Sequence, residues 1–184
     1  MSILPVTLYG DKILRKKAKK VEKIDNETIK LISDMFETMR NADGMGLAAN
    51  QVGSEASIFI VDLSKVQGYE KTKPMVFVNP KITEQSVEES VTEEGCLSIP
   101  DIRGKIKRPE AVKMVYYDAE LNEITLEADD LLARVVQHEY DHLQGIFFTD
   151  RLDDETQRKL KKSLLKIKNR KIEFDYPVTP KDKY

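Results

Sequence analysis

The stretch QHEYDHLQG at residues 137–145 contains the residue types of a metal site at helical spacing. His138 and His142 are four residues apart, so on a helix they lie one above the other on the same face. Glu139 directly follows the first histidine and completes the pattern H-E-x-x-H, in which two imidazoles bind a metal ion and a carboxylate transfers a proton. The pattern indicates a catalytic metal site, and it leaves the third ligand open.

Few residues can supply that third ligand, because the chain contains two histidines and one cysteine. A longer metalloprotease signature continues to a third histidine, but Phe148 occupies that position here. A three-ligand site must therefore recruit Cys96 or a carboxylate. Cys96 lies in EEGCLSIP (93–100), at a predicted turn where Gly95 would let the backbone approach closely. A thiolate with two imidazoles would leave a fourth position open for water, which is typical of catalytic zinc-type sites.

The periodicity of apolar residues predicts the elements that would position these groups. Helices are predicted over residues 25–41, 129–144 and 154–171. The second helix carries the histidine pair and is apolar on most of its surface, so we expect it to be buried. Strands are predicted at SIFIVDL (57–63), MVFVNP (75–80), AVKMVYYD (111–118) and EITLEA (123–128), with an extended edge segment at KITEQSVEESV (81–91). Helices that do not alternate regularly with the strands favour an α+β fold.

Length and composition indicate one globular domain over residues 1–184, with the C-terminal helix at 154–171 and a tail at 172–184. No apolar run approaches the roughly 18 residues that cross a bilayer. The N-terminus lacks the residue order of a secretory signal, and a single cysteine fits a reducing compartment, so we expect a cytoplasmic protein. The net charge of −2 gives no reason to expect DNA binding.

Three motifs occur in the order GMGLAANQ (44–51), EGCLS (94–98) and QHEYDH (137–142). Together they resemble the signature motifs of peptide deformylases, and the resemblance extends from about residue 5 to residue 152. It implies a metal-dependent hydrolase that removes the formyl group from the N-terminal methionine of newly synthesised polypeptides and releases formate. It also implies a fold of antiparallel β-sheets around a central metal-binding helix, with N-terminal and C-terminal helices. EGCLS and the closing helix resemble the bacterial-type branch.

The same resemblance implies roles for individual residues. The implied metal ligands are Cys96, His138 and His142. Glu139 is the implied general base and acid. The side-chain amide of Gln51 and the backbone N–H of Leu97 are the implied oxyanion hole. Cysteine and histidine ligands suit zinc, whereas the resemblance implies one Fe²⁺ per chain, which Zn²⁺, Ni²⁺ or Co²⁺ can replace.

The resemblance also implies contacts with an N-formylmethionyl peptide. We expect Leu97 and Val135 to line a pocket for the methionine side chain, and Met45 and Gly46 to pair with the substrate backbone. Arg103 matches a family position as well, where a structural salt bridge is an equal alternative to a substrate contact.

Two positions depart from the family pattern. Asp130 stands where the family has glycine, and ELNE (120–123) replaces a turn of the Asn-Gly type. Both lie outside the three motifs, so we expect them to change local geometry and not activity.

Three other functions are compatible with parts of the sequence. A zinc metalloprotease would take its third ligand from Asp150, Asp153 or Glu155, but it leaves EGCLS and GMGLAANQ unexplained. A metal-binding protein without catalysis would be expected to lack Glu139 or Gln51. A cysteine protease would use Cys96 with one histidine and leave the other without a role.

The predicted C-terminal helix is basic, and a basic surface binds phosphate backbones. It suggests an association with the ribosome, next to emerging formylated chains. Its basic residues are Arg158, Lys159, Lys161, Lys162, Lys166, Lys168, Arg170 and Lys171.

Overall fold

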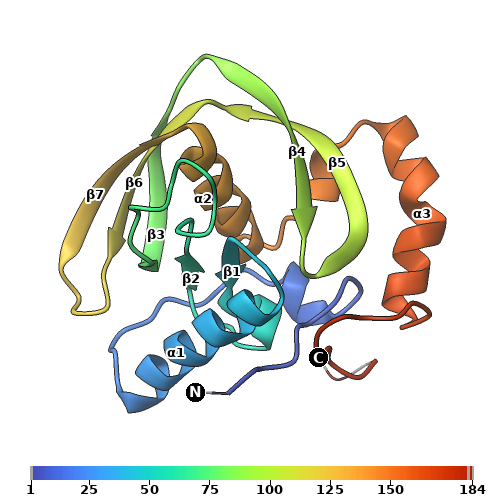
Figure 1. Cartoon of the computed structure of the whole chain (residues 1–184), viewed down its shortest axis with the longest axis horizontal. Helices are drawn as coiled ribbons and strands as arrows, with labels where there is room; N and C mark the ends of the chain where they lie inside the picture. The colour runs from blue at the N-terminus through green and yellow to red at the C-terminus, as the bar shows by residue number, and fades with distance from the viewer. Residues whose placement is uncertain (1, 182, 184) are drawn as a thin grey trace.

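The computed structural model describes residues 2–181 and 183, and this part of the chain contains three α-helices, three short 3₁₀ helices and seven strands (Figure 1). The α-helices are α1 (Asn26–Asn41), α2 (Asp130–Leu143) and α3 (Asp154–Lys168). The 3₁₀ helices are η1 (Lys12–Arg15), η2 (Ala49–Val52) and η3 (Phe148–Arg151). The strands are β1 (Gly46–Ala48), β2 (Ile58–Val61), β3 (Met75–Gln85), β4 (Glu89–Cys96), β5 (Ile99–Pro109), β6 (Ala111–Tyr117) and β7 (Glu123–Asp129).

The strands form two antiparallel units with α2 between them (Figure 1). Five strands pair in the order β1-β2-β3-β6-β7, and β4 pairs with β5 as a separate hairpin. The central helix bonds to the hairpin through polar side chains, since Arg134 donates to the Ile106 carbonyl and Gln137 to the Pro109 carbonyl. This arrangement confirms the expected α+β class and the central position of the histidine-bearing helix.

Each α-helix buries one apolar face against a different part of the sheets. Asp25 caps α1 by accepting a hydrogen bond from the Thr28 N–H at 3.0 Å, and Met35 and Met39 then pack on β1 and β2. Leu164 and Ile167 of α3 join the cluster beneath β5. None of the described helices has the length and apolar character needed to cross a membrane.

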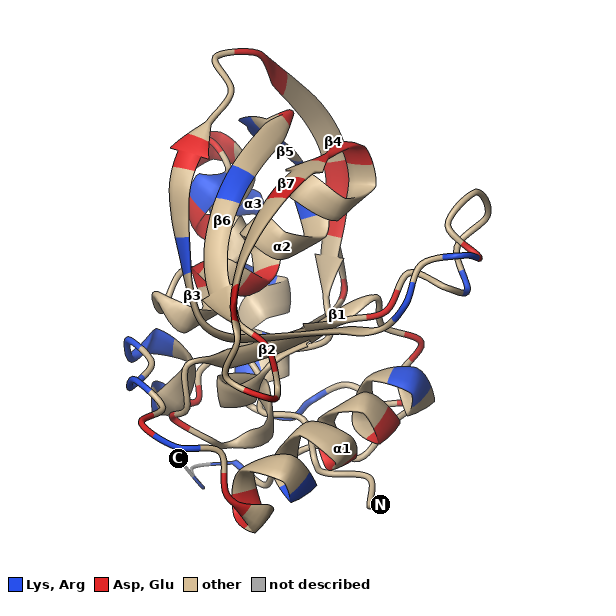
Figure 2. Ribbon diagram, turned by 90° about the vertical axis from the view of Figure 1, so that its left-hand side faces the viewer, with Lys and Arg blue, Asp and Glu red and all other residues tan. Residues whose placement is uncertain are grey.

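Charged residues are interspersed along helices, strands and loops (Figure 2). Lysine plus arginine number 30 and aspartate plus glutamate 32, so the two signs nearly cancel over the whole chain. Any basic surface on this protein is therefore local, and it depends on the residues of the element that carries it.

The predicted strands between residues 81 and 109 differ from the observed ones. Residues 81–91 are not one edge segment, because β3 continues to Gln85 and β4 begins at Glu89. The strand β5 was not predicted, since Pro100, Gly104 and Pro109 are residues that favour loops. The chain tolerates them because β5 pairs with only β4, so its other edge needs no ladder donors. The last helix ends at Lys168, three residues before its predicted end.

Both departures from the family pattern fall on backbone positions that favour glycine. Asp130 has φ +47° at the start of α2, and Leu121 has φ +64° in the β6–β7 turn. This left-handed region is sterically unfavourable for L-residues, and it is less unfavourable for aspartate than for most of them. Asp130 also accepts a hydrogen bond from the Tyr69 hydroxyl at 2.7 Å, which gives the aspartate a local partner. Leu121, which is 43% exposed, has no comparable compensation.

Replacing Leu121 with glycine should therefore stabilise the protein. Removing the steric strain of a leucine with positive φ stabilises the fold by about 1–2 kcal/mol. The larger backbone entropy of glycine in the unfolded chain reduces this gain by up to about 1 kcal/mol. We expect a net rise of about 0.5–1 kcal/mol in the free energy of unfolding, measured by urea denaturation. Glu120→Gly at the adjacent exposed position, where φ is not positive, is the matched control and should lower it. Equal destabilisation by both variants would contradict the assignment of strain to Leu121.

Candidate metal centre

Cys96, His138 and His142 converge on one point between β4 and α2. Cys96 ends β4, and the two histidines lie one turn apart on α2. One sulfur and two ring nitrogens of these residues all lie within 4.8 Å of one another, and Cys96 Sγ is 3.2 Å from His142 Nε2. Among the described residues this is the one group of three such side chains close enough to hold a metal ion. Both histidines are buried, whereas Cys96 is partly exposed.

The donors of this group suit a transition metal. A thiolate and imidazoles bind zinc, iron, nickel and cobalt in preference to Mg²⁺ or Ca²⁺, which take oxygen ligands. His138 Nδ1 lies 2.9 Å from the Glu94 carboxylate, which leaves Nε2 as the free nitrogen of that ring. A carboxylate on the far nitrogen is the usual partner of a metal-binding histidine, because it fixes the ring orientation and the tautomer. The residues present therefore fit a resident metal ion.

Glu94 is held in turn by a buried arginine. Arg108 of β5, 1% exposed, donates from Nε to Glu94 at 2.7 Å and from Nη1 to Asp141 at 2.7 Å. Arg134 of α2 also reaches Glu94, at 3.3 Å. Burial by itself raises the pKa of Glu94, but the hydrogen bonds from His138 and Arg108 outweigh burial and lower it to about 2. Glu94 is therefore a carboxylate at neutral pH and accepts from the His138 ring.

Glu139 lies on α2 between the two histidines and is 4% exposed. Burial raises the pKa of Glu139 to about 7. Its Oε2 atom is buried and has no hydrogen-bond partner among the described residues. A Cβ atom added at Gly46 would lie 2.6 Å from Glu139 Oε1, so β1 packs against this carboxylate more closely than any other residue type permits. The carboxylate is therefore tightly enclosed and does not lie in open solvent.

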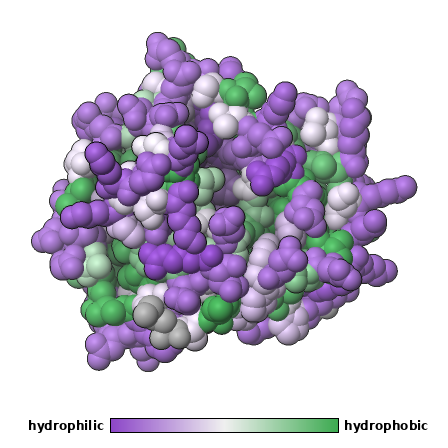
Figure 3. Space-filling model, viewed as in Figure 1, coloured by the Kyte–Doolittle hydropathy of each residue, from purple (hydrophilic) through white to green (hydrophobic). Residues whose placement is uncertain are grey.

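Gln51 of η2 presents its amide nitrogen to the cysteine. Its Oε1 atom accepts a hydrogen bond from the Ala48 N–H at 2.8 Å, which sets which end of the amide carries the donors. Its Nε2 atom is 3.2 Å from Ser98 Oγ and 3.5 Å from Cys96 Sγ. The three predicted motifs thus meet at one site. Figure 3 shows a hollow in the upper part of this face, with mainly hydrophilic residues around its rim and some hydrophobic ones below it.

Comparisons with known proteins give the family. The sequence family described as polypeptide deformylase matches residues 3–158. A peptide deformylase of Chlorobium phaeobacteroides (strain BS1) is 47% identical over 176 residues, which cover 96% of this chain and 95% of that protein. The chain belongs to the peptide deformylase family.

Other relatives agree in sequence and in fold. A peptide deformylase of Salinibacter ruber is 44% identical, covering 98% of this chain and 96% of that protein. The crystal structure of the Ehrlichia chaffeensis peptide deformylase in complex with actinonin matches with a TM-score of 0.84 and 37% identity, over 94% of this chain and 100% of that one. Deformylases are metalloenzymes that remove the N-formyl group from nascent peptides, and this chain is a hydrolase of that kind.

The carboxylates that a metalloprotease would need are engaged away from the deformylase site. Asp150 pairs with Arg15, Asp153 caps α3 through the Thr156 N–H, and Glu155 pairs with Lys159. These contacts, together with the family, exclude the protease alternative for the third ligand.

The remaining predicted residues lie in different surroundings. Leu97 is half-buried beside Cys96, and its N–H has no hydrogen-bond acceptor among the described residues. Val135 is buried on α2, one turn before Glu139, and Met45 is 42% exposed beside β1. Arg103 is exposed and makes no ion pair in the described part of the chain, so the structure lacks the salt bridge considered for it.

The close approach expected at Gly95 is absent. A Cβ atom there would meet nothing nearer than 3.6 Å, which is ordinary contact distance, and its nearest neighbour is the Arg103 side chain. The close approach occurs instead at Gly46, the glycine of the first motif that packs on Glu139.

Sequence analysis missed the residues that hold the ligands in place. Glu94, Arg108 and Asp141 form the buried ion network, and Asn50 donates to the His142 carbonyl at 2.6 Å. Glu94, Asp141 and Asn50 lie inside the quoted motifs, and Asp141 lies on the helix that was predicted to be buried. A charged residue in such a stretch was the available signal, because buried charges need partners.

Glu94→Gln should weaken metal binding without removing a ligand. The amide keeps the shape of the side chain but gives His138 a weaker partner, and such changes typically cost 10–100-fold in metal affinity. Competition with a chelator would measure the loss. Glu93→Gln makes the same substitution at the neighbouring exposed residue and should leave the affinity unchanged. Equal affinities for the two variants would contradict the role assigned to Glu94.

Proposed function

We propose that this chain hydrolyses the formyl–nitrogen bond of N-formylmethionyl peptides at a metal ion held by Cys96, His138 and His142, with Glu139 as the proton carrier. The observation that carries the proposal is the convergence of one sulfur and two imidazole nitrogens beside a buried carboxylate. The chemistry that a divalent cation supplies there is Lewis acidity, which makes water nucleophilic near neutral pH and polarises a carbonyl oxygen.

Glu139 accepts the proton of the attacking water and later delivers it to the leaving amine. Its helix position between the two histidine ligands supports this role, since a general base must lie within hydrogen-bond reach of the water it activates. Gly46 supports it too, because the packing of β1 on Glu139 limits the motion of the carboxylate. The products are formate and a free N-terminal amine, so one water molecule balances the reaction.

Gln51 and Leu97 stabilise the negative charge that develops on the former formyl oxygen. The Gln51 amide nitrogen already points at the cysteine, and the Leu97 N–H has no acceptor among the described residues. Donors that are oriented before the reaction lower its barrier without reorganisation at the moment of attack. Both donors lie next to the sulfur ligand, on the side where the site is partly exposed.

The outer edge of β1 receives the substrate backbone. β1 is an edge strand of the five-stranded sheet, and the Met45 carbonyl accepts from the Asp62 N–H of the neighbouring chain segment. In an antiparallel ladder the bonding direction alternates, so the N–H and C=O of Gly46 face away from β2. An extended peptide can pair with these groups as an added strand.

Side-chain contacts give the specificity for formylmethionine in this proposal. Two apolar residues line the methionine pocket: Leu97, which follows the sulfur ligand, and Val135, which lies one turn before Glu139. Because a formyl carbon carries only hydrogen, a tight wall behind it admits formyl and rejects larger acyl groups by steric overlap. Arg103, exposed and without an ion pair in the described chain, is available to contact the peptide beyond its first residue.

Fe²⁺ is the metal we propose for the cell, one ion per chain, with Zn²⁺, Ni²⁺ or Co²⁺ able to replace it. Cysteine and histidine donors accept all four ions. The partly exposed thiolate of Cys96 must stay reduced to bind metal, which supports a cytoplasmic location. The whole chain, 1–184, acts as one catalytic domain, since residues after α3 pack in the same apolar cluster as β5.

Glu139→Gln should lower kcat for formate release from a formyl-Met peptide by about 10²–10⁴-fold, the usual contribution of general acid–base catalysis. The bound metal should remain, because no ligand changes. Glu88→Gln, at an exposed turn residue, is the control and should keep full activity. Wild-type activity in Glu139→Gln, or cleavage of internal peptide bonds by the wild type, would contradict the proposal.

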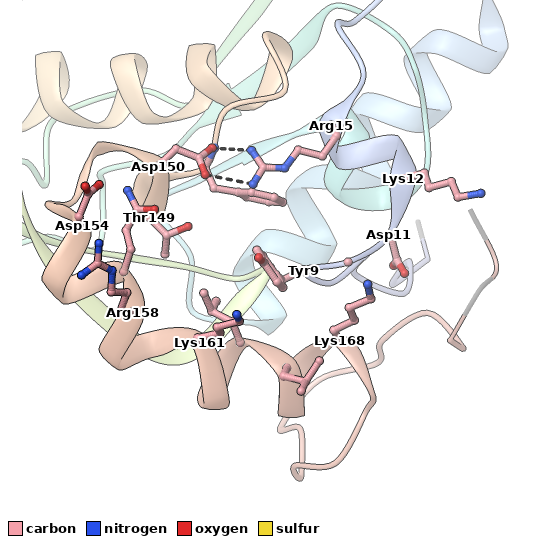
Figure 4. A pocket seen from close by; sticks show the side chains of 15 residues that line it. Tyr9, Asp11, Lys12, Arg15, Thr149, Asp150, Asp154, Arg158, Lys161 and Lys168 are labelled. Atoms are coloured by element: carbon pink, nitrogen blue, oxygen red, sulfur yellow. Dashed lines mark hydrogen bonds and ion pairs between the residues drawn. The ribbon is translucent and has the colours of Figure 1, made fainter.

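A pocket whose lining contains five cationic and three acidic side chains supports the further proposal that the enzyme associates with the ribosome (Figure 4). The pocket has a volume of about 760 Å³, lies between η1 and α3, and includes none of the metal ligands. Arg158, Lys161 and Lys168 of α3 and Lys12 of η1 line it and make no ion pair in the described chain. Arg170, which was counted with the basic residues, instead pairs with Asp11 beyond the end of the helix.

Reversing two of these charges should weaken ribosome binding. The double variant Arg158→Glu, Lys161→Glu is expected to lose co-sedimentation with ribosomes at low salt, and the difference from wild type should shrink as salt rises. Lys65→Glu, Lys71→Glu makes the same change of charge on the exposed 62–74 loop and is the control. Equal co-sedimentation of both double variants at low salt would contradict the association through α3.

A further inference from the structure

The chain after α3 is an extended segment that returns to the body of the protein. In the stretch KIEFDYPVT (171–179) every second side chain is partly buried, and these side chains pack on the cluster beneath β5. The packed residues are Ile172, Phe174, Tyr176 and Val178. This period of two is that of a half-buried strand. The segment is therefore part of the fold, although it lies beyond the region that the family pattern matches, residues 3–158.

The C-terminal segment is tied to the start of the chain. The Val6 N–H donates to the Pro177 carbonyl and the Val6 carbonyl accepts from the Thr179 N–H, both at 2.9 Å. A buried group of polar residues adds to this pairing, since Asp11 accepts from both Arg170 and Thr179 at 2.8 Å. These contacts fix the C-terminal segment along residues 6–11.

The other side of the N-terminal segment bonds to the catalytic motifs. The Thr7 N–H donates to the Gln51 carbonyl at 2.7 Å, and the Tyr9 N–H donates to the Ser98 carbonyl at 2.8 Å. Successive residues of an extended chain point in opposite directions, so Val6 faces the C-terminal segment while Thr7 and Tyr9 face the active site. Residues 6–9 thus connect the end of the chain to both oxyanion motifs.

Tyr176 makes the direct contact with the active site. Its hydroxyl donates to the Leu97 carbonyl at 2.6 Å. Leu97 and Ser98 form the two-residue connection between β4 and β5, directly after the Cys96 ligand. Their two carbonyls are bonded by Tyr176 from one chain end and by Tyr9 from the other, so both peptide planes after Leu97 are fixed. A fixed Leu97 carbonyl restricts rotation about Leu97 and with it the direction of the Leu97 N–H.

We propose that Tyr176 is a positioning residue of the deformylase reaction: it holds the Leu97 peptide so that the Leu97 N–H points at the reacting formyl oxygen. This inference rests on the oxyanion role proposed for Leu97. The C-terminal segment is then the support of a catalytic donor and not a passive tail. Preorganised donors lose most of their effect when their supporting contacts loosen.

Tyr176→Phe removes only the hydroxyl and keeps the packed ring. We expect kcat to fall about 3- to 10-fold, the factor that corresponds to one neutral hydrogen bond, with KM unchanged within about twofold. The order parameter of the Leu97 N–H, measured by ¹⁵N relaxation NMR on the zinc-loaded protein, should fall in the same variant, because the Leu97 peptide is held less firmly. Metal content should stay at the wild-type level, because Cys96 and both histidines are intact.

Ile172→Val is the matched control, since it weakens the packing of the same segment and keeps the Tyr176 hydroxyl. We expect this variant to have a lower Tm but the wild-type kcat and the wild-type order parameter of the Leu97 N–H. Equal losses of kcat in the two variants would overturn it, because the segment would then act through stability alone. A lower order parameter of the Leu97 N–H in Tyr176→Phe with unchanged kcat would also overturn it, and would place the error in the oxyanion role of Leu97. A wild-type enzyme that releases no formate would refute the proposed function itself.

Discussion

The structure depends on one buried carboxylate, Glu94, which bonds to His138 on one side and to Arg108 on the other. The proposed metal ligands come from two separate elements, since Cys96 ends β4 and the histidines lie on α2. Only a contact across that gap can hold them at bonding distance. Arg108 completes the bridge by pairing with Asp141, so the hairpin and the helix are joined through charges that are all buried. Removing one partner of such a network typically costs about 3–5 kcal/mol, because the remaining charge is left uncompensated.

Two segments near the ends of the chain, residues 6–9 and 171–179, support the same site. Tyr9 and Tyr176 hold the Leu97–Ser98 connection, and Thr7 holds Gln51, so the two predicted oxyanion donors share one scaffold. On the opposite side, Gly46 lets β1 lie directly against Glu139. The proposed catalytic groups therefore lie at a strand end, on a buried helix, on a short 3₁₀ helix and in a turn held by hydrogen bonds, and not on free loops. Rigid support of this kind is what transition-state stabilisation by fixed donors requires.

The grouping of Cys96, His138 and His142 could be predicted because their residue types are scarce and their chemistry is local. Two histidines at a spacing of four and a single cysteine leave little choice, and the order of three motifs gave the family. The helices followed from apolar periodicity, and α2 was predicted within one residue at each end. The contacts that hold the ligands could not be read in this way. Glu94 and Arg108 are not register partners in the β4–β5 hairpin, since Glu94 lies opposite Gly104 and Arg108 opposite Ser90, so strand pairing alone would not predict their contact. In addition, β5 carries two prolines and a glycine that mask its strand character. The alternating pattern of residues 171–179 was visible in the sequence, but its partner, residue 6, lies at the other end of the chain.

The central claim is that one sulfur and two imidazole nitrogens bind the catalytic metal. X-ray absorption spectroscopy at the metal edge, on protein purified without oxygen, measures this coordination directly. We expect one sulfur neighbour at about 2.3 Å and two imidazole nitrogens at about 2.0–2.1 Å per metal. The sulfur neighbour should be lost in Cys96→Ser. A first shell of nitrogen and oxygen alone in the wild type would contradict it, because Cys96 would then not be a ligand and the site would have to be built from other residues.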